Sequence, residues 1–154
     1  ATIMTWERSK KSKDARPEID LCARIFDYYA ENGEKLLAPK EYDTEEGKGT
    51  LVHQPVGIIY GIQPWNFPFY QPSRVAAPQL VAGNVVLTKH ASNVPQCAEA
   101  FDKVLKDAGV PEGVHTNLQL SARNAGSIID DDRVQGVAFR IESGSCSVNQ
   151  MSWT

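Results

Sequence analysis

The sequence lacks three features that would each point to a class of protein. Its longest apolar runs, such as Val56–Ile59, fall far short of the roughly 18 residues that indicate a membrane span. Its 16 basic and 19 acidic residues give a net charge of -3 and no cationic stripe for nucleic acid. Its start, ATIMTWERSKKSK, has no signal-peptide apolar stretch. We therefore expect a soluble cytoplasmic protein with neither a membrane nor a nucleic acid as partner.

Cysteine is also scarce, and the three residues Cys22, Cys97 and Cys146 are widely spaced. They form neither a CxxC motif nor a Cys/His cluster with zinc spacing, so we expect reduced thiols and no metal. Cys22 and Cys97 lie on the apolar stripes of predicted helices, where a core position is expected. Cys146 has no neighbouring base that would activate it as a nucleophile.

The hydrophobic pattern predicts strands that alternate with helices. We expect helices within 14–38, 69–83, 91–113 and 121–132, a loop or hairpin at 41–49, and extended segments at 51–62, 84–90, 115–120 and 134–139. Such alternation indicates right-handed crossovers. The predicted fold is α/β, a Rossmann-like doubly wound parallel sheet of about four strands with an N-terminal helical segment. The predicted division is a helical segment with its connecting loop at 1–50, a cofactor-binding domain at 51–139 and a C-terminal strand segment at 140–154.

Several turn and cap residues refine these limits. Pro17 is placed near the first turn of its helix, and Gly33 is expected to weaken that helix. Gly83 is a predicted C-terminal cap. Asn93 and Gln96 have the spacing of a capping box.

Two polar segments follow predicted strands, and ligands of such sheets bind beyond the carboxyl ends of strands. In the first, Trp65 either covers a ligand or packs under the loop, and Asn66 is either an oxyanion donor or a turn former. In the second, Lys89 either extends to water or donates to a ribose or phosphate, with Ser92 and the next helix N-terminus adding donors. The usual dinucleotide fingerprint GxGxxG is missing.

With PWNFP at 64–68, a strand that ends in Lys89 and GVPEGV at 109–114, the chain resembles the aldehyde dehydrogenase superfamily, most closely its succinate-semialdehyde dehydrogenase-like members. The resemblance covers about residues 14–139. It implies NAD(P)-dependent oxidation of an aldehyde, such as succinate semialdehyde, to the acid through a catalytic cysteine.

The resemblance also implies roles for individual residues. Asn66 matches the catalytic oxyanion-stabilising asparagine, and Ile62, Pro64 and Trp65 match, together with Asn66, the nicotinamide side of the cofactor site. Lys89 matches the lysine that contacts the adenosine ribose. Ser92 stands where NAD-preferring members often have Glu, so the expected cofactor is NADP or NAD. His90 stands where the family usually has Pro.

The chain departs from the family after Phe139. A Thr-Gly-Ser turn is usual there, but this sequence reads Arg140-Ile141-Glu142, and 140–154 resembles a strand near the far carboxyl end of family members. The segment with the catalytic Cys and Glu is therefore expected to be absent from this chain. The alternative function is a non-catalytic nucleotide-binding or protein-interaction module, and a homo-oligomer is expected to cover exposed family interfaces.

Overall fold

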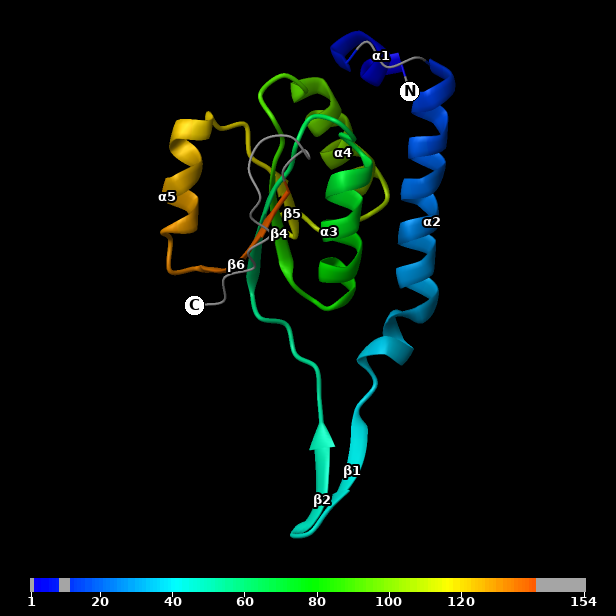
Figure 1. Ribbon diagram of the computed structural model, residues 1–154, viewed down its shortest axis with the longest axis vertical. Coiled ribbons are helices and arrows are strands. Elements are labelled where there is room, and N and C mark those ends of the chain that lie inside the picture. The colour runs from blue at the N-terminus through cyan, green and yellow to red at the C-terminus, as the bar shows by residue number, and fades with distance from the viewer. Residues whose placement is uncertain (1, 9–11, 141–154) are drawn as a thin grey trace.

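The computed structural model describes residues 2–8 and 12–140, which form helices, a hairpin and one larger sheet (Figure 1). The chain begins with α1 (Thr2–Arg8) and α2 (Ser12–Leu37), followed by the antiparallel hairpin of β1 (Lys40–Thr44) and β2 (Gly47–Leu51). The remaining elements are β3 (Ile58–Ile62), α3 (Tyr70–Val81), β4 (Val85–Lys89), α4 (Pro95–Asp107), β5 (His115–Asn117), η1 (Ala122–Asn124), α5 (Ala125–Ile129) and β6 (Val134–Phe139).

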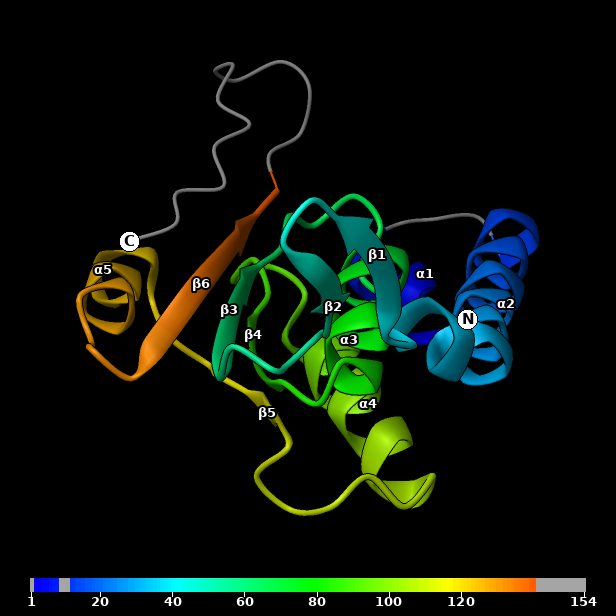
Figure 2. The same cartoon turned by 90° about the horizontal axis from the view of Figure 1, so that it is seen from below.

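The larger sheet has four strands in the order β5-β4-β3-β6, and all of its neighbours are parallel. Helices α3 and α4 cover one face with α2 beyond them, and α5 lies on the other side, next to β6 (Figures 1 and 2). This arrangement confirms the predicted α/β class and its parallel sheet. Our division of the chain at residues 50 and 139 stays a prediction.

The main core lies between the helices and not against the hairpin. Met4, Cys22, Phe69, Phe101 and Leu105 belong to one buried cluster, which joins α1 and α2 to the helices beside the sheet. A smaller cluster of Ile59, Val75 and Val86 packs α3 against β3 and β4. Because α1 and α2 contribute to the main cluster, they fold onto the sheet region as one body.

Helix α2 differs from its predicted course at Pro17 and Gly33. The helix begins at Ser12, so Pro17 lies inside it and not near its first turn. Gly33 does not interrupt the helix, which continues to Leu37. A Cβ atom at this position would collide with the side chain of Val81 on α3. The glycine lets α2 approach α3 closely.

The predicted limits at the end of the chain also change. β5 is only three residues long, so 118–120 leaves the sheet. The helix predicted within 121–132 begins as the 3₁₀ turn η1 and continues as the short α5. Gly83 follows α3 with a φ of 84°, as expected for a C-terminal cap.

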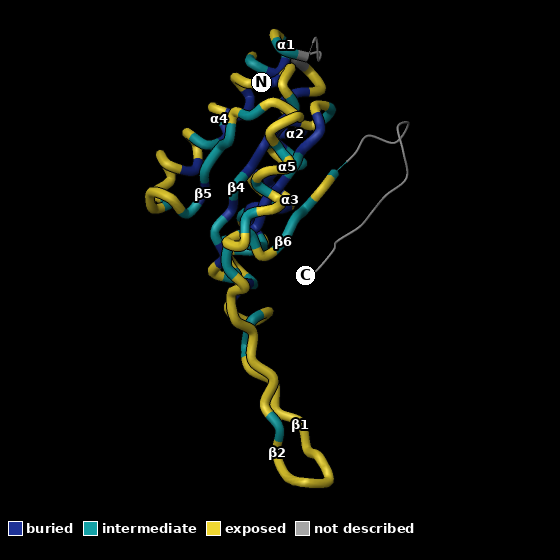
Figure 3. Tube along the Cα trace, turned by 90° about the vertical axis from the view of Figure 1, so that its left-hand side faces the viewer, coloured by how far each residue is buried: buried dark blue, intermediate teal, exposed yellow. Residues whose placement is uncertain are grey.

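The hairpin β1–β2 stands away from the rest of the molecule, and its residues are almost all exposed (Figure 3). Of the two predictions for 41–49, a loop or a hairpin, the hairpin is therefore correct. No helix in the described part of the chain is both long and apolar enough to cross a membrane.

Candidate functional site

The strand order reverses at β3, because β4 and β6 flank that strand on opposite sides. Ile62 is in register with Lys89 of β4 on one side and with Phe139 of β6 on the other. The pairing continues past the strands, since Gln63 N donates to Lys89 O at 2.9 Å and Arg140 N donates to Ile62 O at 3.1 Å. Ligands of doubly wound sheets bind at such a reversal.

The loop 63–69 leaves β3 at this point and is fixed by two buried side chains. The Glu18 carboxylate of α2 accepts hydrogen bonds from the backbone N–H groups of Phe69, at 2.9 Å, and Tyr70, at 3.1 Å. His90 Nε2 lies 2.9 Å from Pro68 O and, since a carbonyl only accepts, carries the hydrogen. The loop is thus held from α2 and from the end of β4.

Within this loop the predicted site residues face different surroundings. Pro64 is buried and Ile62 is half-buried, whereas Trp65 is 39% exposed and therefore not a core residue. Asn66 is half-buried, and its Oδ1 is buried without a hydrogen-bond partner among the described residues. Trp65 and Asn66 therefore remain candidate binding residues on a loop that is anchored at its far end.

Lys89 does not extend to water, because it is only 5% exposed. Its Nζ donates to His90 O at 3.2 Å, and no carboxylate of the described residues pairs with it. Burial lowers the pKa of Lys89. A buried ammonium without a counter-charge favours an anionic or hydroxyl-rich ligand nearby.

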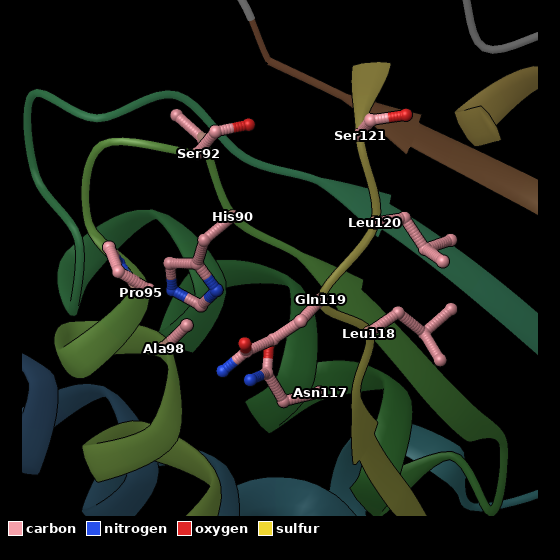
Figure 4. A pocket seen from close by; sticks show the side chains of 10 residues that line it. His90, Ser92, Pro95, Ala98, Asn117, Leu118, Gln119, Leu120 and Ser121 are labelled. Atoms are coloured by element: carbon pink, nitrogen blue, oxygen red, sulfur yellow. The ribbon is translucent and has the colours of Figure 1, made fainter. Parts of the chain in front are cut away.

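A cavity of about 230 Å³ opens beside the carboxyl ends of β4 and β5 (Figure 4). Ser92 is the one predicted site residue that lines it; Ile62, Pro64, Trp65, Asn66 and Lys89 do not. In Figure 4, Asn117 and Gln119 extend from the β5 side toward the His90 ring. The lining residues are His90, Ala91, Ser92, Pro95, Ala98, Asn117, Leu118, Gln119, Leu120 and Ser121.

Sequence reasoning missed a row of buried polar groups along this edge. Gln63 follows β3, His90 follows β4 and Asn117 ends β5. Both side-chain polar atoms of Gln63, Nδ1 of His90 and Oδ1 of Asn117 are buried without partners in the described part of the chain. Such atoms are rare in folded proteins and mark this edge as a candidate binding site. The signal in the sequence was a polar residue at the end of each apolar strand.

The N-terminus of α4 is already occupied by a side chain, which corrects two predictions. Gln96 N and Cys97 N donate to the two Glu7 carboxylate oxygens at 2.7 and 2.9 Å. The N-cap residue is Val94, without a side-chain cap, so the capping box of Asn93 and Gln96 is wrong. These backbone groups are therefore not free to bind a phosphate.

The described cysteines are not reactive groups. Cys22 and Cys97 are buried thiols, which confirms their predicted core positions. Burial raises the pKa of the Cys97 thiol, and the hydrogen bond and charge of Glu7 raise it further. Cys146 and the predicted C-terminal strand lie outside the described residues.

Comparison with known proteins shows to which family the chain belongs. The model of the aldehyde dehydrogenase family matches residues 1–150. The chain belongs to this family. Over 139 residues, it is 43% identical to the succinate-semialdehyde dehydrogenase [NADP(+)] of Deinococcus radiodurans, covering 90% of this chain and 29% of the relative. A probable enzyme of the same name from Synechocystis is 43% identical over 135 residues, covering 88% and 30%.

A solved structure agrees with the sequence relatives. The succinic semialdehyde dehydrogenase of Streptococcus pyogenes, crystallised with NADP+ as the cofactor, is 40% identical with a TM-score of 0.86. The match covers 88% of this chain and 30% of that one. The resemblance seen in the sequence is confirmed, and the chain spans about 30% of the length of these relatives.

Proposed function

We propose that this chain carries the nucleotide-binding part of an NADP-dependent aldehyde dehydrogenase of the succinate-semialdehyde type. The observation that carries the proposal is the buried, uncompensated ammonium of Lys89 on the strand beside the reversal, one residue before His90 of the cavity wall. Relatives at 43% identity bear the name succinate-semialdehyde dehydrogenase [NADP(+)], which favours NADP+ over NAD+.

The residues at the carboxyl edge fit the adenosine half of such a cofactor. Lys89 supplies donors to ribose oxygens, and Ser92 is exposed at the cavity with a neutral hydroxyl. A carboxylate at position 92 would repel a 2′-phosphate, whereas a hydroxyl donates to it. NADP+ is therefore preferred, and NAD+ is tolerated.

The loop after β3 would contact the reacting half of the cofactor, the nicotinamide, and the aldehyde substrate. Ile62, Pro64 and Trp65 would wall the nicotinamide, which supplies a hydride acceptor when bound. Asn66 would donate its amide hydrogen to the oxyanion formed from an aldehyde substrate, a contact worth about 3 kcal/mol in transition states. The anchors Glu18 and His90 hold this loop in place before substrate arrives.

Cofactor binding is tested by titrating the full chain with NADP+ and NAD+ in a calorimeter. We expect binding of NADP+ in the micromolar range, its loss in Lys89→Met, and a preference for NAD+ in Ser92→Glu. Lys103→Met, an exposed lysine on α4, is the matched control and should bind as the parent chain does. No binding at millimolar NADP+, with an intact thermal transition, would leave only the family fold.

Aldehyde oxidation by this chain alone should be negligible, because the described cysteines are buried and Cys146 lacks a neighbouring base in the sequence. Reduction of NADP+ with succinate semialdehyde, lost in Cys146→Ala, would overturn this expectation. The assay requires only the purified chain and the absorbance of the reduced cofactor.

A second candidate is an interaction module, which the hairpin β1–β2 favours. Tyr42, Leu51 and Val52 are each about half exposed on or beside it, at 52%, 47% and 53%. Exposed apolar side chains on a projecting hairpin suit contact with a second copy of the chain. Analytical ultracentrifugation tests this, and a strict monomer at high concentration would count against it.

A further inference from the structure

His90 connects the cavity to the loop after β3. It is 5% exposed, lies directly after β4 and lines the cavity with Ser92 and Asn117. Its Nε2–H donates to the carbonyl of Pro68, two residues beyond Asn66, at 2.9 Å. One ring therefore contacts the proposed adenosine side and the loop of the proposed reacting side.

The second ring nitrogen of His90 has a defined chemical character. Burial is the main cause that lowers the pKa of His90 to about 4, so the ring is neutral at pH 7. Because Nε2 carries the hydrogen, Nδ1 is a lone-pair acceptor. Among the described residues this buried acceptor has no partner, and the same holds for Oδ1 of Asn117 in the same cavity wall.

His115 shows that the fold can satisfy a buried imidazole when no ligand is needed. It is 3% exposed and, like His90, its ring lies next to the ring of Phe101. Its Nδ1–H donates to Asp102 at 2.9 Å, and its Nε2 accepts from the Thr88 hydroxyl at 3.1 Å. Both nitrogens of His115 are thus occupied within the protein.

We propose that His90 both binds the nucleotide and positions the loop after β3: its Nδ1 accepts a hydrogen bond from a hydroxyl or amino donor of the adenosine half, while its Nε2–H holds the loop of Trp65 and Asn66. The inference rests on the proposed function and extends it to a residue that the family resemblance does not assign. Occupation of the cavity and placement of the loop then depend on one side chain.

The chemistry excludes the alternative in which His90 binds the 2′-phosphate. A neutral ring with Nε2–H committed to Pro68 offers only a lone pair, and a phosphate oxygen is also an acceptor. A donor on ribose or adenine is the complementary group. The 2′-phosphate is left to Ser92, so the contact of His90 and the contact of the phosphate are separable by ligand.

Nitrogen NMR of the imidazoles gives the direct test, since the chain has three histidines. The full chain, labelled with ¹⁵N, is titrated with adenosine 2′,5′-bisphosphate, and each resonance is assigned from His→Gln variants. We expect the Nδ1 resonance of His90 to move toward that of a hydrogen-bonded acceptor, without protonation. Binding with an unmoved Nδ1, or with Nδ1 protonated by the phosphate, would overturn the proposal.

Variants separate positioning from packing. His90→Phe removes both hydrogen bonds, and it should weaken binding by about three- to tenfold, the usual effect of a lost neutral hydrogen bond. His90→Gln retains an amide donor for Pro68 and an acceptor, so it should recover part of this loss. His115→Gln, the matched buried control, should change affinity by less than about twofold when the chain is folded.

The outcomes also separate this inference from the proposed function. If the parent chain binds no NADP+ at millimolar concentration, the proposed function fails and the role of His90 fails with it. If NADP+ binds and Lys89→Met abolishes binding, but His90→Phe binds as the parent does, only the inference fails. An equal loss in His90→Phe and His115→Gln would also reject it, because the effect would then be general destabilisation.

Discussion

Two groups of polar side chains, one around His115 and one around His90, lie beside the ring of Phe101 and differ in how their hydrogen-bonding atoms are satisfied. In the network that joins α4 to the strands beneath it, Lys106 donates to Asp102, His115 donates to the same carboxylate, and Thr88 donates to His115. At the carboxyl edge, Gln63 and His90 carry buried atoms without partners in the described chain. The first group is completed within the protein, and the second is not.

Truncation of the ring that lies between the two groups should have the largest effect. Phe101 is 4% exposed and packs against both His90 and His115. Phe101→Ala should lower the free energy of unfolding by about 3 to 5 kcal/mol, as is usual for a buried phenylalanine. Chemical denaturation measures it. Val104→Ala, 61% exposed on the same helix, should stay within about 0.5 kcal/mol.

Lowering the pH should decrease the free energy of unfolding through His90. The pKa of His90 is lowered to about 4 when folded and is about 6.5 when unfolded, so the unfolded chain takes up the proton first. Stability is therefore complete above pH 6.5 and should fall by about 2 to 3 kcal/mol by pH 4.5 through this residue. Denaturation curves of the parent and His90→Gln isolate the contribution. Parallel pH profiles would contradict it.

Removal of one donor beneath α4 should have a smaller effect. Thr88 is 1% exposed, and Thr88→Val leaves Nε2 of His115 without its hydrogen-bond donor. We expect a loss of about 1 to 3 kcal/mol in the free energy of unfolding. Thr116→Val, on the adjacent strand and only half-buried, is the control and should change little. Equal losses in the two variants would show that the hydrogen bond from Thr88 to His115 adds no stability of its own.

The sequence predicts the ends of the strands well, because an apolar run and the residue that ends it are local features. The strand at 134–139 has its predicted limits, and Lys89 ends its strand as expected. The capping of α4 could not be predicted, because Glu7 lies 89 residues from Gln96 in the chain. The state of His90 also depends on a distant carbonyl, that of Pro68, which periodicity does not reveal.

The smallest expected effect has the opposite sign and gives the sharpest test of the comparison. Gln63 is 3% exposed, and both polar atoms of its amide lack partners in the described chain. Gln63→Met keeps the volume and removes the unsatisfied amide, so stability should rise by about 1 kcal/mol. NADP+ binding should weaken if the amide awaits the ligand.

A partnered glutamine provides the control for this substitution. Gln79 accepts a hydrogen bond from Asn84 Nδ2 at 2.6 Å, so Gln79→Met should destabilise the chain where Gln63→Met stabilises it. Both are measured by chemical denaturation with and without NADP+. If Gln63→Met instead loses stability in the absence of ligand, bound water already satisfies the edge. The polar row would then be a hydrated structural layer, and the contrast with the network beneath α4 would disappear.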